Sequence, residues 1–173
     1  MSKIVTVFGS GQIKADTSDY QRAYQLGKLL GENGFAVCNG GYGGVMEASA
    51  KGAKEAGAHT IGITSLEAKG WANPWIQEER KAATWRDRLF GLIDAGSAYV
   101  LFDGATGTLT ELFVIWEMTN KKLIQKPVLI MGEQVTAWAN SLRGNPAIVF
   151  NDFLKFTPEP EAALNELLVH QRL

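Results

Sequence analysis

Two glycine-rich turns hold the residues of this 173-residue chain whose types and spacing are suited to chemistry. The first turn reads NGGYGGVMEA, and its glycines are Gly40, Gly41, Gly43 and Gly44. Glycine frees backbone N–H groups to point at an anion, and the helix that follows adds a favourable dipole. Four glycines among five residues exceed what a tight strand-to-helix turn needs for steric reasons. We therefore predict an anion-binding turn.

The second turn, DGATGTLTE, repeats this arrangement at residues 103–111. Gly104 and Gly107 permit the turn. The hydroxyls of Thr106 and Thr108, together with nearby backbone amides, are suited to holding a phosphate. Neither turn matches the dinucleotide fingerprint G-x-G-x-x-G or the P-loop, which ends in Gly-Lys-Ser/Thr. The two turns together predict a phosphorylated ligand between them, and NAD is a poor choice.

Glu111 ends this motif, and two roles are open for its carboxylate. Thr108-x-x-Glu111 has the spacing of a capping box, in which both side chains satisfy free N–H groups of a helix N-terminus. A carboxylate at such a helix end also faces the crevice where a ligand binds, which suits acid–base chemistry. Sequence alone leaves both roles open.

Two arginines stand close together in the helical stretch ATWRDRLFGLIDA. Arg86 and Arg88 are two residues apart, so they point to different parts of the helix surface and are not expected to share a role. For each, a solvated surface position and a ligand-binding position are equally compatible with the pattern. Asp87 between them is suited to a local ion pair.

The composition excludes several function classes. Hydrophobic residues make up 46% of the chain and charged residues 20%, and the net charge of -1 gives no general attraction to nucleic acid or anionic lipid. We find no signal-peptide pattern and no apolar run of membrane-spanning length. We therefore expect a soluble, cytoplasmic protein with neither a nucleic-acid nor a membrane partner.

The cysteine and histidine residues give no signal for a metal or a nucleophile. Cys38 is alone, which rules out an intramolecular disulfide, and its apolar setting FAVC predicts a buried thiol. His59 and His170 have no cysteine or carboxylate at metal-ligand spacing, so we predict no metal site. A G-x-S-x-G nucleophile motif is absent as well.

Short apolar runs alternate with longer helical patterns along the chain. We predict strands at 4–8, 35–38, 59–64, 98–102, 128–131 and 148–150. We predict helices at about 19–33, from the glycine turn to about 57, at 85–95, 108–120 and 135–142, and from 158 onward. Ser18-x-x-Gln21 resembles a capping box that opens the first helix, and 65–74 resembles a loop. The alternation predicts a single α/β domain over residues 1–173, Rossmann-like, with a mainly parallel sheet and helices on both faces.

In such sheets, ligands bind outside the carboxyl ends of the strands, near the point where the strand order reverses. The loops that follow the strands at this edge are 9–18, 39–44, 65–84 and 103–108. We expect the ligand among them.

The helix TELFVIWEMTNKK is apolar on nearly all sides. One face of it would cover the sheet, and a helix that is apolar all round is buried all round. This predicts a homodimer through the 108–120 helix. Coverage by the C-terminal helix is the alternative.

The segments GGYGGVMEASAKGAKEAGAHTIGI and DGATGTLTE, together with Arg88, resemble the LONELY GUY family, also labelled "possible lysine decarboxylase". The resemblance covers most of the chain, from FGSG to KKLIQKPVLIMG. The short turn GGYGGVMEA is more similar to the molybdenum-cofactor-carrier-like branch of this group than to the branch that activates plant hormones.

The resemblance implies hydrolysis of the N-glycosidic bond of a nucleoside 5′-monophosphate, giving free base and ribose 5-phosphate, in a dimer without a metal or redox cofactor. Arg88 and Glu111 would be the catalytic pair, with Glu111 orienting or deprotonating water. Backbone amides of residues 104–108 would hold the phosphate, while Met46, Gly9 and Ser10 would flank the base and ribose.

The chain departs from the family motif P-G-G-x-G-T-x-x-E, which follows an Arg-Lys pair. Asp103 and Ala105 replace the proline and the second glycine, and Leu89 replaces the lysine. Asp103 would repel a nearby phosphate, bind ribose hydroxyls or act as a second carboxylate. The alternative function is therefore a non-catalytic protein that binds or carries a nucleotide or the molybdenum cofactor. We reject lysine decarboxylation, because no lysine stands in a suitable phosphate-site context.

Overall fold

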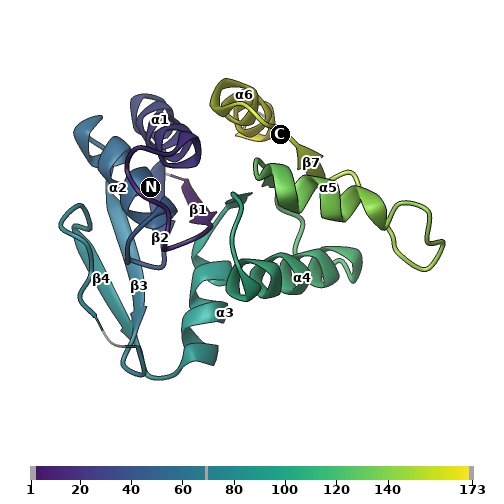
Figure 1. The fold of residues 1–173 in the computed structure, drawn as a ribbon, viewed down its shortest axis with the longest axis horizontal. Helices are drawn as coiled ribbons and strands as arrows, with labels where there is room; N and C mark the ends of the chain where they lie inside the picture. The colour runs from purple at the N-terminus through teal and green to yellow at the C-terminus, as the bar shows by residue number, and fades with distance from the viewer. Residues whose placement is uncertain (1–2, 69, 172–173) are drawn as a thin grey trace.

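The structure is a computed structural model and describes residues 3–68 and 70–171. A seven-stranded parallel sheet lies at its centre, in the order β4-β3-β2-β1-β5-β6-β7 (Figure 1). The strands are β1 (Ile4–Phe8), β2 (Ala36–Asn39), β3 (Thr60–Ser65), β4 (Glu78–Ala82), β5 (Ala98–Leu101), β6 (Val128–Ile130) and β7 (Leu154–Phe156). The helices are α1 (Ser18–Glu32), α2 (Val45–Glu55), α3 (Trp85–Ala95), α4 (Thr106–Asn120), α5 (Glu133–Ser141) and α6 (Pro160–Gln171).

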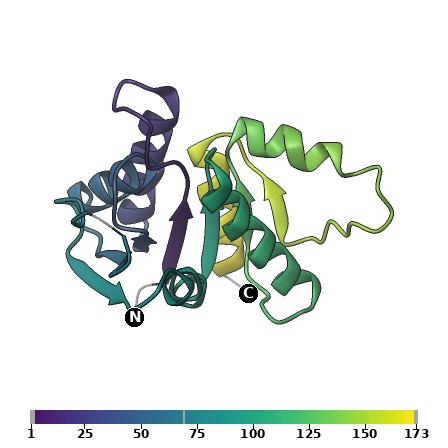
Figure 2. The ribbon, with the colours of Figure 1, turned by 60° about the horizontal axis from the view of Figure 1, so that its bottom comes forward.

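Strand order reverses next to β1. The chain places β2, β3 and β4 successively on one side of β1 and then returns to its other side with β5, β6 and β7. Figure 2 shows this division, with the first half of the chain on one side of β1 and the green to yellow half on the other. The fold is the α/β fold with a parallel sheet that the alternating pattern predicts, and its ligand crevice belongs beyond the carboxyl ends of β1 and β5.

Helices cover both faces of the sheet. The helices α1, α2 and α6 pack on one face through a core that includes Val7, Leu26 and Leu167. The helices α3, α4 and α5 belong to the core of the other face, which includes Leu92 and Ile115. The central strands β2, β1, β5 and β6 supply side chains to both cores, so they are buried on both sides, as is typical of parallel sheets.

The strand β4 was not predicted. Its sequence, EERKA, is charged at every position before Ala82 and largely exposed, so it lacks the apolar pattern by which strands are recognised. It is an edge strand that pairs only with β3, in register from Ile61 and Glu78 to Ser65 and Ala82. Charged side chains are typical of exposed sheet edges.

The last predicted strand, at 148–150, was wrong: the sheet instead ends with β7 at Leu154–Phe156. Residues 148–150 pack on the outside of α4, where the Trp116 indole N–H donates to the carbonyl of Val149 at 2.7 Å. They cover α4 together with α5, which contributes Trp138 against Phe113. The predicted alternative cover, the C-terminal helix α6, packs on the opposite face of the sheet.

Neither capping box that the sequence suggests is formed. The N-cap of α1 is Thr17, whose hydroxyl accepts from the Tyr20 N–H, while Gln21 donates to the carbonyl of Ala15. The helix α4 begins two residues earlier than predicted and has Ala105 as its N-cap, so Thr108 lies within its first turn. Glu111 therefore does not cap α4.

Candidate ligand-binding site

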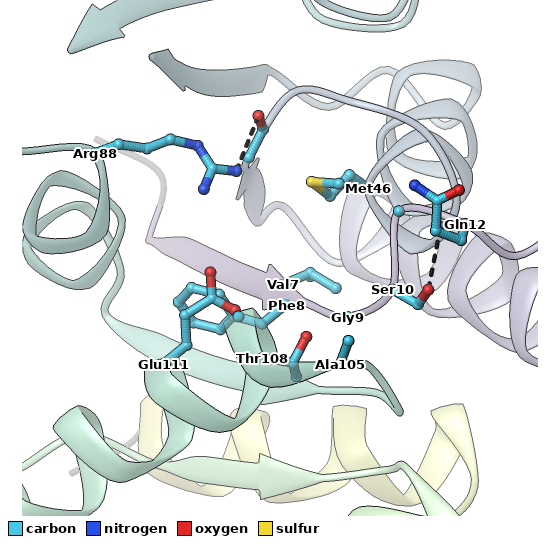
Figure 3. Close-up of a pocket in the computed structure, with 13 residues that line it drawn as sticks. Val7, Phe8, Gly9, Ser10, Gln12, Met46, Arg88, Ala105, Thr108 and Glu111 are labelled. Carbon is cyan, nitrogen blue, oxygen red and sulfur yellow. Dashed lines mark hydrogen bonds between the residues drawn. The ribbon is translucent and has the colours of Figure 1, made fainter. Parts of the chain in front are cut away.

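A cavity of about 280 Å³ lies where the strand order reverses (Figure 3). Residues that follow β1, β2 and β5 meet around it, together with side chains from α2, α3 and α4. Its lining comprises Val7, Phe8, Gly9, Ser10, Gly11, Gln12, Gly40, Met46, Arg88, Ala105, Gly107, Thr108 and Glu111. The cavity thus occupies the crevice expected for a ligand in a sheet of this topology.

Many of the residues selected from the sequence border this cavity, although they come from four separate segments. These are Gly9, Ser10, Gly40, Met46, Arg88, Gly107, Thr108 and Glu111. The selected residues that do not line it are Gly41, Gly43, Gly44, Asp103, Gly104 and Thr106. The structure adds Val7, Phe8, Gly11, Gln12 and Ala105. The sequence could have pointed to these residues through their position, because they lie at the end of β1 or in the loops that follow β1 and β5. Those loops lie at the carboxyl edge of the sheet, where a ligand is expected.

The N-terminus of α4 opens toward the cavity. Its N-cap, Ala105, supplies no side-chain hydrogen bond to the first turn. The side chain of Thr108, which is buried, has its hydroxyl directed into the cavity without a hydrogen-bond partner among the described residues (Figure 3). Free N–H groups and the dipole of a helix N-terminus favour an anion. This wall is therefore suited to a phosphate group.

Glu111 lies one turn further along α4 and also faces the cavity. Burial raises the pKa of its carboxyl group to about 7, and the positive charge of Arg88 offsets part of that rise. A glutamate with this pKa is partly protonated near neutral pH, so it can both accept and donate a proton. Perturbed carboxyl groups in cavities are typical of functional sites.

Arg88 reaches the cavity from α3 and is held by backbone carbonyl groups. Its Nε donates to the carbonyl of Ile63 at 2.9 Å, and its Nη2 donates to the carbonyl of Gly40 at 3.3 Å. A Cβ atom at Gly40 would overlap Nη2, so only glycine leaves room for this arginine. The guanidinium of Arg88 is thus held by two backbone carbonyl groups, and no described acidic side chain forms an ion pair with it.

The other glycines of the first turn serve backbone packing. Gly41 and Gly44 have φ of 81° and 63°, where glycine is favoured. Gly44 packs directly on the carbonyl of Ser10, and that carbonyl accepts from the first amide of α2, that of Val45, at 2.9 Å. This turn joins the loop after β1 to α2, while Gly40 alone among its four glycines borders the cavity.

Asp103 points away from the cavity and caps α5. Its two carboxylate oxygens accept from the backbone N–H groups of Gln134, at 3.1 Å, and Val135, at 2.9 Å. Its negative charge is therefore compensated by the N-terminus of α5. The geometry supports neither repulsion of a phosphate by this carboxylate nor a role as a second acid in the cavity.

The other two departures from the family motif have similarly local explanations. Ala105 has a φ of −89°, which any residue adopts, so the position does not need glycine. Leu89 is buried in the core beneath α3, so a lysine at this position would not face the cavity. Neither residue changes the cation content of the cavity wall.

The parallel sheet and its strand order define a Rossmann-like domain, with a cavity where the strand order reverses. The chain belongs to the SLOG cluster4 family, whose sequence profile matches residues 2–146. An uncharacterized protein from Archaeoglobus fulgidus is 32% identical over 132 residues, which cover 76% of this chain and 85% of that protein.

Solved structures share this fold at low sequence identity. The molybdenum cofactor binding protein of Rippkaea orientalis has a TM-score of 0.80 at 22% identity, covering 98% of this chain and 97% of the other. The molybdenum cofactor carrier protein of Chlamydomonas reinhardtii has a TM-score of 0.75 at 21% identity, covering both chains fully. DNA processing protein A of Helicobacter pylori has a TM-score of 0.68 at 15% identity, covering 97% and 81%. Identities this low establish the shared fold alone.

None of the helices within residues 3–68 and 70–171 is long and apolar enough to cross a membrane.

Proposed function

We propose that this chain binds a small phosphorylated molecule with an aromatic base, of the nucleotide or pterin type, in the cavity between β1 and β5. The observation that carries the proposal is that the uncapped N-terminus of α4 and the free hydroxyl of Thr108 open into the same cavity as Arg88. Backbone amides, a hydroxyl and a guanidinium are the groups that bind phosphate in proteins.

The charge balance of the cavity supports an anionic ligand. Arg88 has no ion pair with any described acidic residue, and protonated Glu111 adds no negative charge. Asp103 lies outside the cavity lining, and its carboxylate accepts from two backbone N–H groups of α5. A phosphomonoester therefore meets one cation and a helix N-terminus, and no carboxylate of the cavity lining opposes it while Glu111 is protonated.

The named structural neighbours agree with a binding role. Among them, a molybdenum cofactor carrier protein from Chlamydomonas is 25% identical to this chain with a TM-score of 0.70. Binding or carriage of a phosphorylated ligand is accordingly our principal proposal for this protein.

The direct test compares ligands that differ only in the phosphate. Isothermal titration with AMP, adenosine and ribose 5-phosphate isolates the phosphate contribution, and a pterin monophosphate tests the second base type. We expect AMP to bind at least tenfold more tightly than adenosine, given the strength of charge-assisted hydrogen bonds. Thr108→Val should reduce the difference. Equal affinity for AMP and adenosine would show that the phosphate contributes nothing to binding, and would contradict the proposed phosphate site.

A second function, hydrolysis of the N-glycosidic bond of a nucleoside 5′-monophosphate, is favoured by one observation. Glu111, with a pKa of about 7, faces the same cavity as Arg88. The C1′–N bond would break through an oxocarbenium-like transition state, and the departing base would keep the electron pair. The ionised carboxylate would take a proton from water as the water oxygen bonds to C1′, and the protonated Glu111 would then supply a proton to the base.

Chromatography of free base after incubation with AMP, GMP, CMP and UMP tests this activity. Base release that Glu111→Gln abolishes would establish turnover. Tight binding of AMP without base release would leave the binding function alone.

We also propose a homodimer through an aromatic patch of α4 and α5. Phe113 is 45% exposed and packs edge-on against Trp138, which is 36% exposed, at a centroid distance of 5.0 Å. Val149 extends this patch. Light scattering at micromolar concentration tests the proposal, with a dimer mass for the native chain and a monomer mass for Phe113→Glu. A monomer mass for the native chain would contradict it.

Nucleic acid is not among the partners that we propose, although DNA processing protein A shares the fold. The net charge of -1 gives this chain no general attraction for a phosphate backbone. A filter-binding assay with single-stranded DNA at low salt tests this.

A further inference from the structure

The aromatic ring of Tyr42 lies against the guanidinium of Arg88. The guanidinium carbon of Arg88 is 5.5 Å from the centroid of the Tyr42 ring. The Tyr42 hydroxyl accepts from the backbone N–H of Ser65 at 3.3 Å. The aromatic ring is thus tied at its far end to the end of β3 and presents a face to the cation.

The backbone that carries this ring is fixed by two asparagines. The N–H of Gly41 donates to the Asn39 side-chain oxygen at 2.8 Å. The Asn73 side-chain amide donates to the carbonyl of Tyr42 at 2.8 Å and to that of Gly41 at 3.1 Å. These hydrogen bonds restrict the position of Tyr42, so its ring is a fixed surface against which the guanidinium of Arg88 packs.

Arg88 is consequently held in three ways. Two carbonyl groups, those of Ile63 and Gly40, accept from its N–H groups, and the Tyr42 ring stabilises its charge. None of the three carries a negative charge. The electric field of the guanidinium therefore remains available to Glu111 and to an anionic ligand.

We infer that Tyr42 is a positioning residue that holds the Arg88 guanidinium at the cavity wall, where its charge acts on Glu111 and on the ligand. The effect on the ligand rests on the proposed function. The effect on Glu111 does not, because both residues face the cavity whether or not a ligand is bound.

The test follows the carboxyl group of Glu111 by NMR in protein labelled with ¹³C-glutamate, with the signal assigned by its loss in Glu111→Gln. Arg88 lowers the pKa of this carboxyl group, so Tyr42→Leu should move its titration midpoint upward. Tyr42→Phe keeps the ring and should stay close to the native midpoint. In an Arg88→Gln background, Tyr42→Leu should have no further effect on the midpoint.

Tyr24→Leu is the matched control, since the Tyr24 ring also faces a cation at 5.9 Å, but that cation is Lys51, which does not line the cavity. It should leave the Glu111 midpoint unchanged. A Tyr42→Leu variant that melts at a lower temperature with an unchanged Glu111 midpoint would reduce Tyr42 to a packing residue and overturn the inference.

If Tyr42→Leu does not fold, ring-fluorinated phenylalanine at position 42 preserves the shape and weakens only the attraction of the ring for a cation. The midpoint should then rise relative to Tyr42→Phe, and equal midpoints would overturn the inference.

Titration of AMP separates this inference from the proposed function. AMP should bind roughly two- to thirtyfold more weakly to Tyr42→Leu than to the native chain, as expected for loss of a cation–π contact. A native chain that binds neither AMP nor the pterin monophosphate, but whose Glu111 midpoint responds to Tyr42→Leu, would refute the proposed function and uphold the positioning role. Native affinity in Tyr42→Leu would overturn the positioning of Arg88 for the ligand.

Discussion

Arg88 and Glu111 face the same cavity from α3 and α4 without forming an ion pair (Figure 3). The hydrogen bonds of Arg88 go to carbonyl groups, so the carboxyl group of Glu111 experiences its charge without a direct bond. Burial therefore dominates, and the pKa of Glu111 stays near 7. Four predictions follow from the residues around this pair.

Glu111→Gln should stabilise the protein at alkaline pH. In the unfolded chain a glutamate ionises near pH 4.3, whereas burial raises the pKa of Glu111 to about 7 in the fold. Between these values the folded state binds the additional proton, so the native chain loses stability as the pH rises from about 4.3 to 7 and levels off above. The loss is on the order of 3 kcal/mol.

Gln resembles the neutral carboxyl group, so Glu111→Gln should lack this loss and exceed the native stability at about pH 8. Urea unfolding near pH 4.5 and pH 8 measures it. Glu117→Gln is the control, because Glu117 lies on the same helix, exposed and paired with Lys121 at 3.1 Å. A pH dependence of the native chain that persists in Glu111→Gln would show that another group titrates.

Arg88→Gln should weaken AMP binding at least tenfold and up to roughly a hundredfold, since a charge-assisted hydrogen bond contributes about 1.5–3 kcal/mol. It should also raise the pKa of Glu111 further, because the only favourable charge that acts on it is removed. Titration calorimetry and the Glu111 NMR signal give the two readouts.

Arg86→Gln removes an exposed arginine two residues earlier on the same helix, outside the cavity. This variant should change neither the affinity for AMP nor the pKa of Glu111. A similar loss of AMP affinity in both variants would point to general electrostatics in place of a specific contact.

Gly40→Ala should keep the fold and displace Arg88. The added methyl group would overlap the Arg88 Nη2 and lie 2.7 Å from the Met46 sulfur, and both are ends of flexible side chains. We expect weaker AMP binding with a melting temperature close to the native value. Gly144→Ala, which meets nothing within 4 Å, serves as the control. Native AMP affinity in Gly40→Ala would mean that the position of Arg88 does not matter for binding.

Asp103→Ala should reduce stability by about 1 kcal/mol, because two N–H groups at the start of α5 lose their acceptor. AMP affinity should remain within about twofold of native, as expected for a carboxylate outside the cavity. Thermal unfolding and calorimetry measure the two effects, with the exposed Asp152→Ala as the comparison. A large gain in AMP affinity would restore the idea that Asp103 repels the phosphate.

The sequence allowed the architecture and the edge that holds the cavity to be predicted. The periodicity of the buried strands and helices is a local signal, and the glycine turns mark the ends of β2 and β5. The strand β4 was not predicted because an exposed edge strand needs no apolar pattern, as the sequence EERKA illustrates. Residues 148–150 were misassigned because apolar residues that pack on a helix resemble a buried strand.

Side-chain direction was the harder part of the site. Thr108 and Glu111 have the spacing of a capping box, and only the true start of α4 shows that both face the cavity. Asp103 looked like a cavity residue because it follows a strand, but its partner is α5, about thirty residues later in the chain. A contact between residues this far apart in the chain cannot be predicted from the spacing of neighbouring residues.

The charged side chains of β4 also limit how copies of this protein can associate. Arg80 and Lys81 pair with Glu78 and Glu79 within the strand itself, at 2.6 and 3.8 Å. A strand that docked on this edge would have to desolvate these charged side chains, which makes the edge a poor template for the addition of strands. Copies of the protein are therefore less prone to join edge to edge here than they would be along an apolar strand.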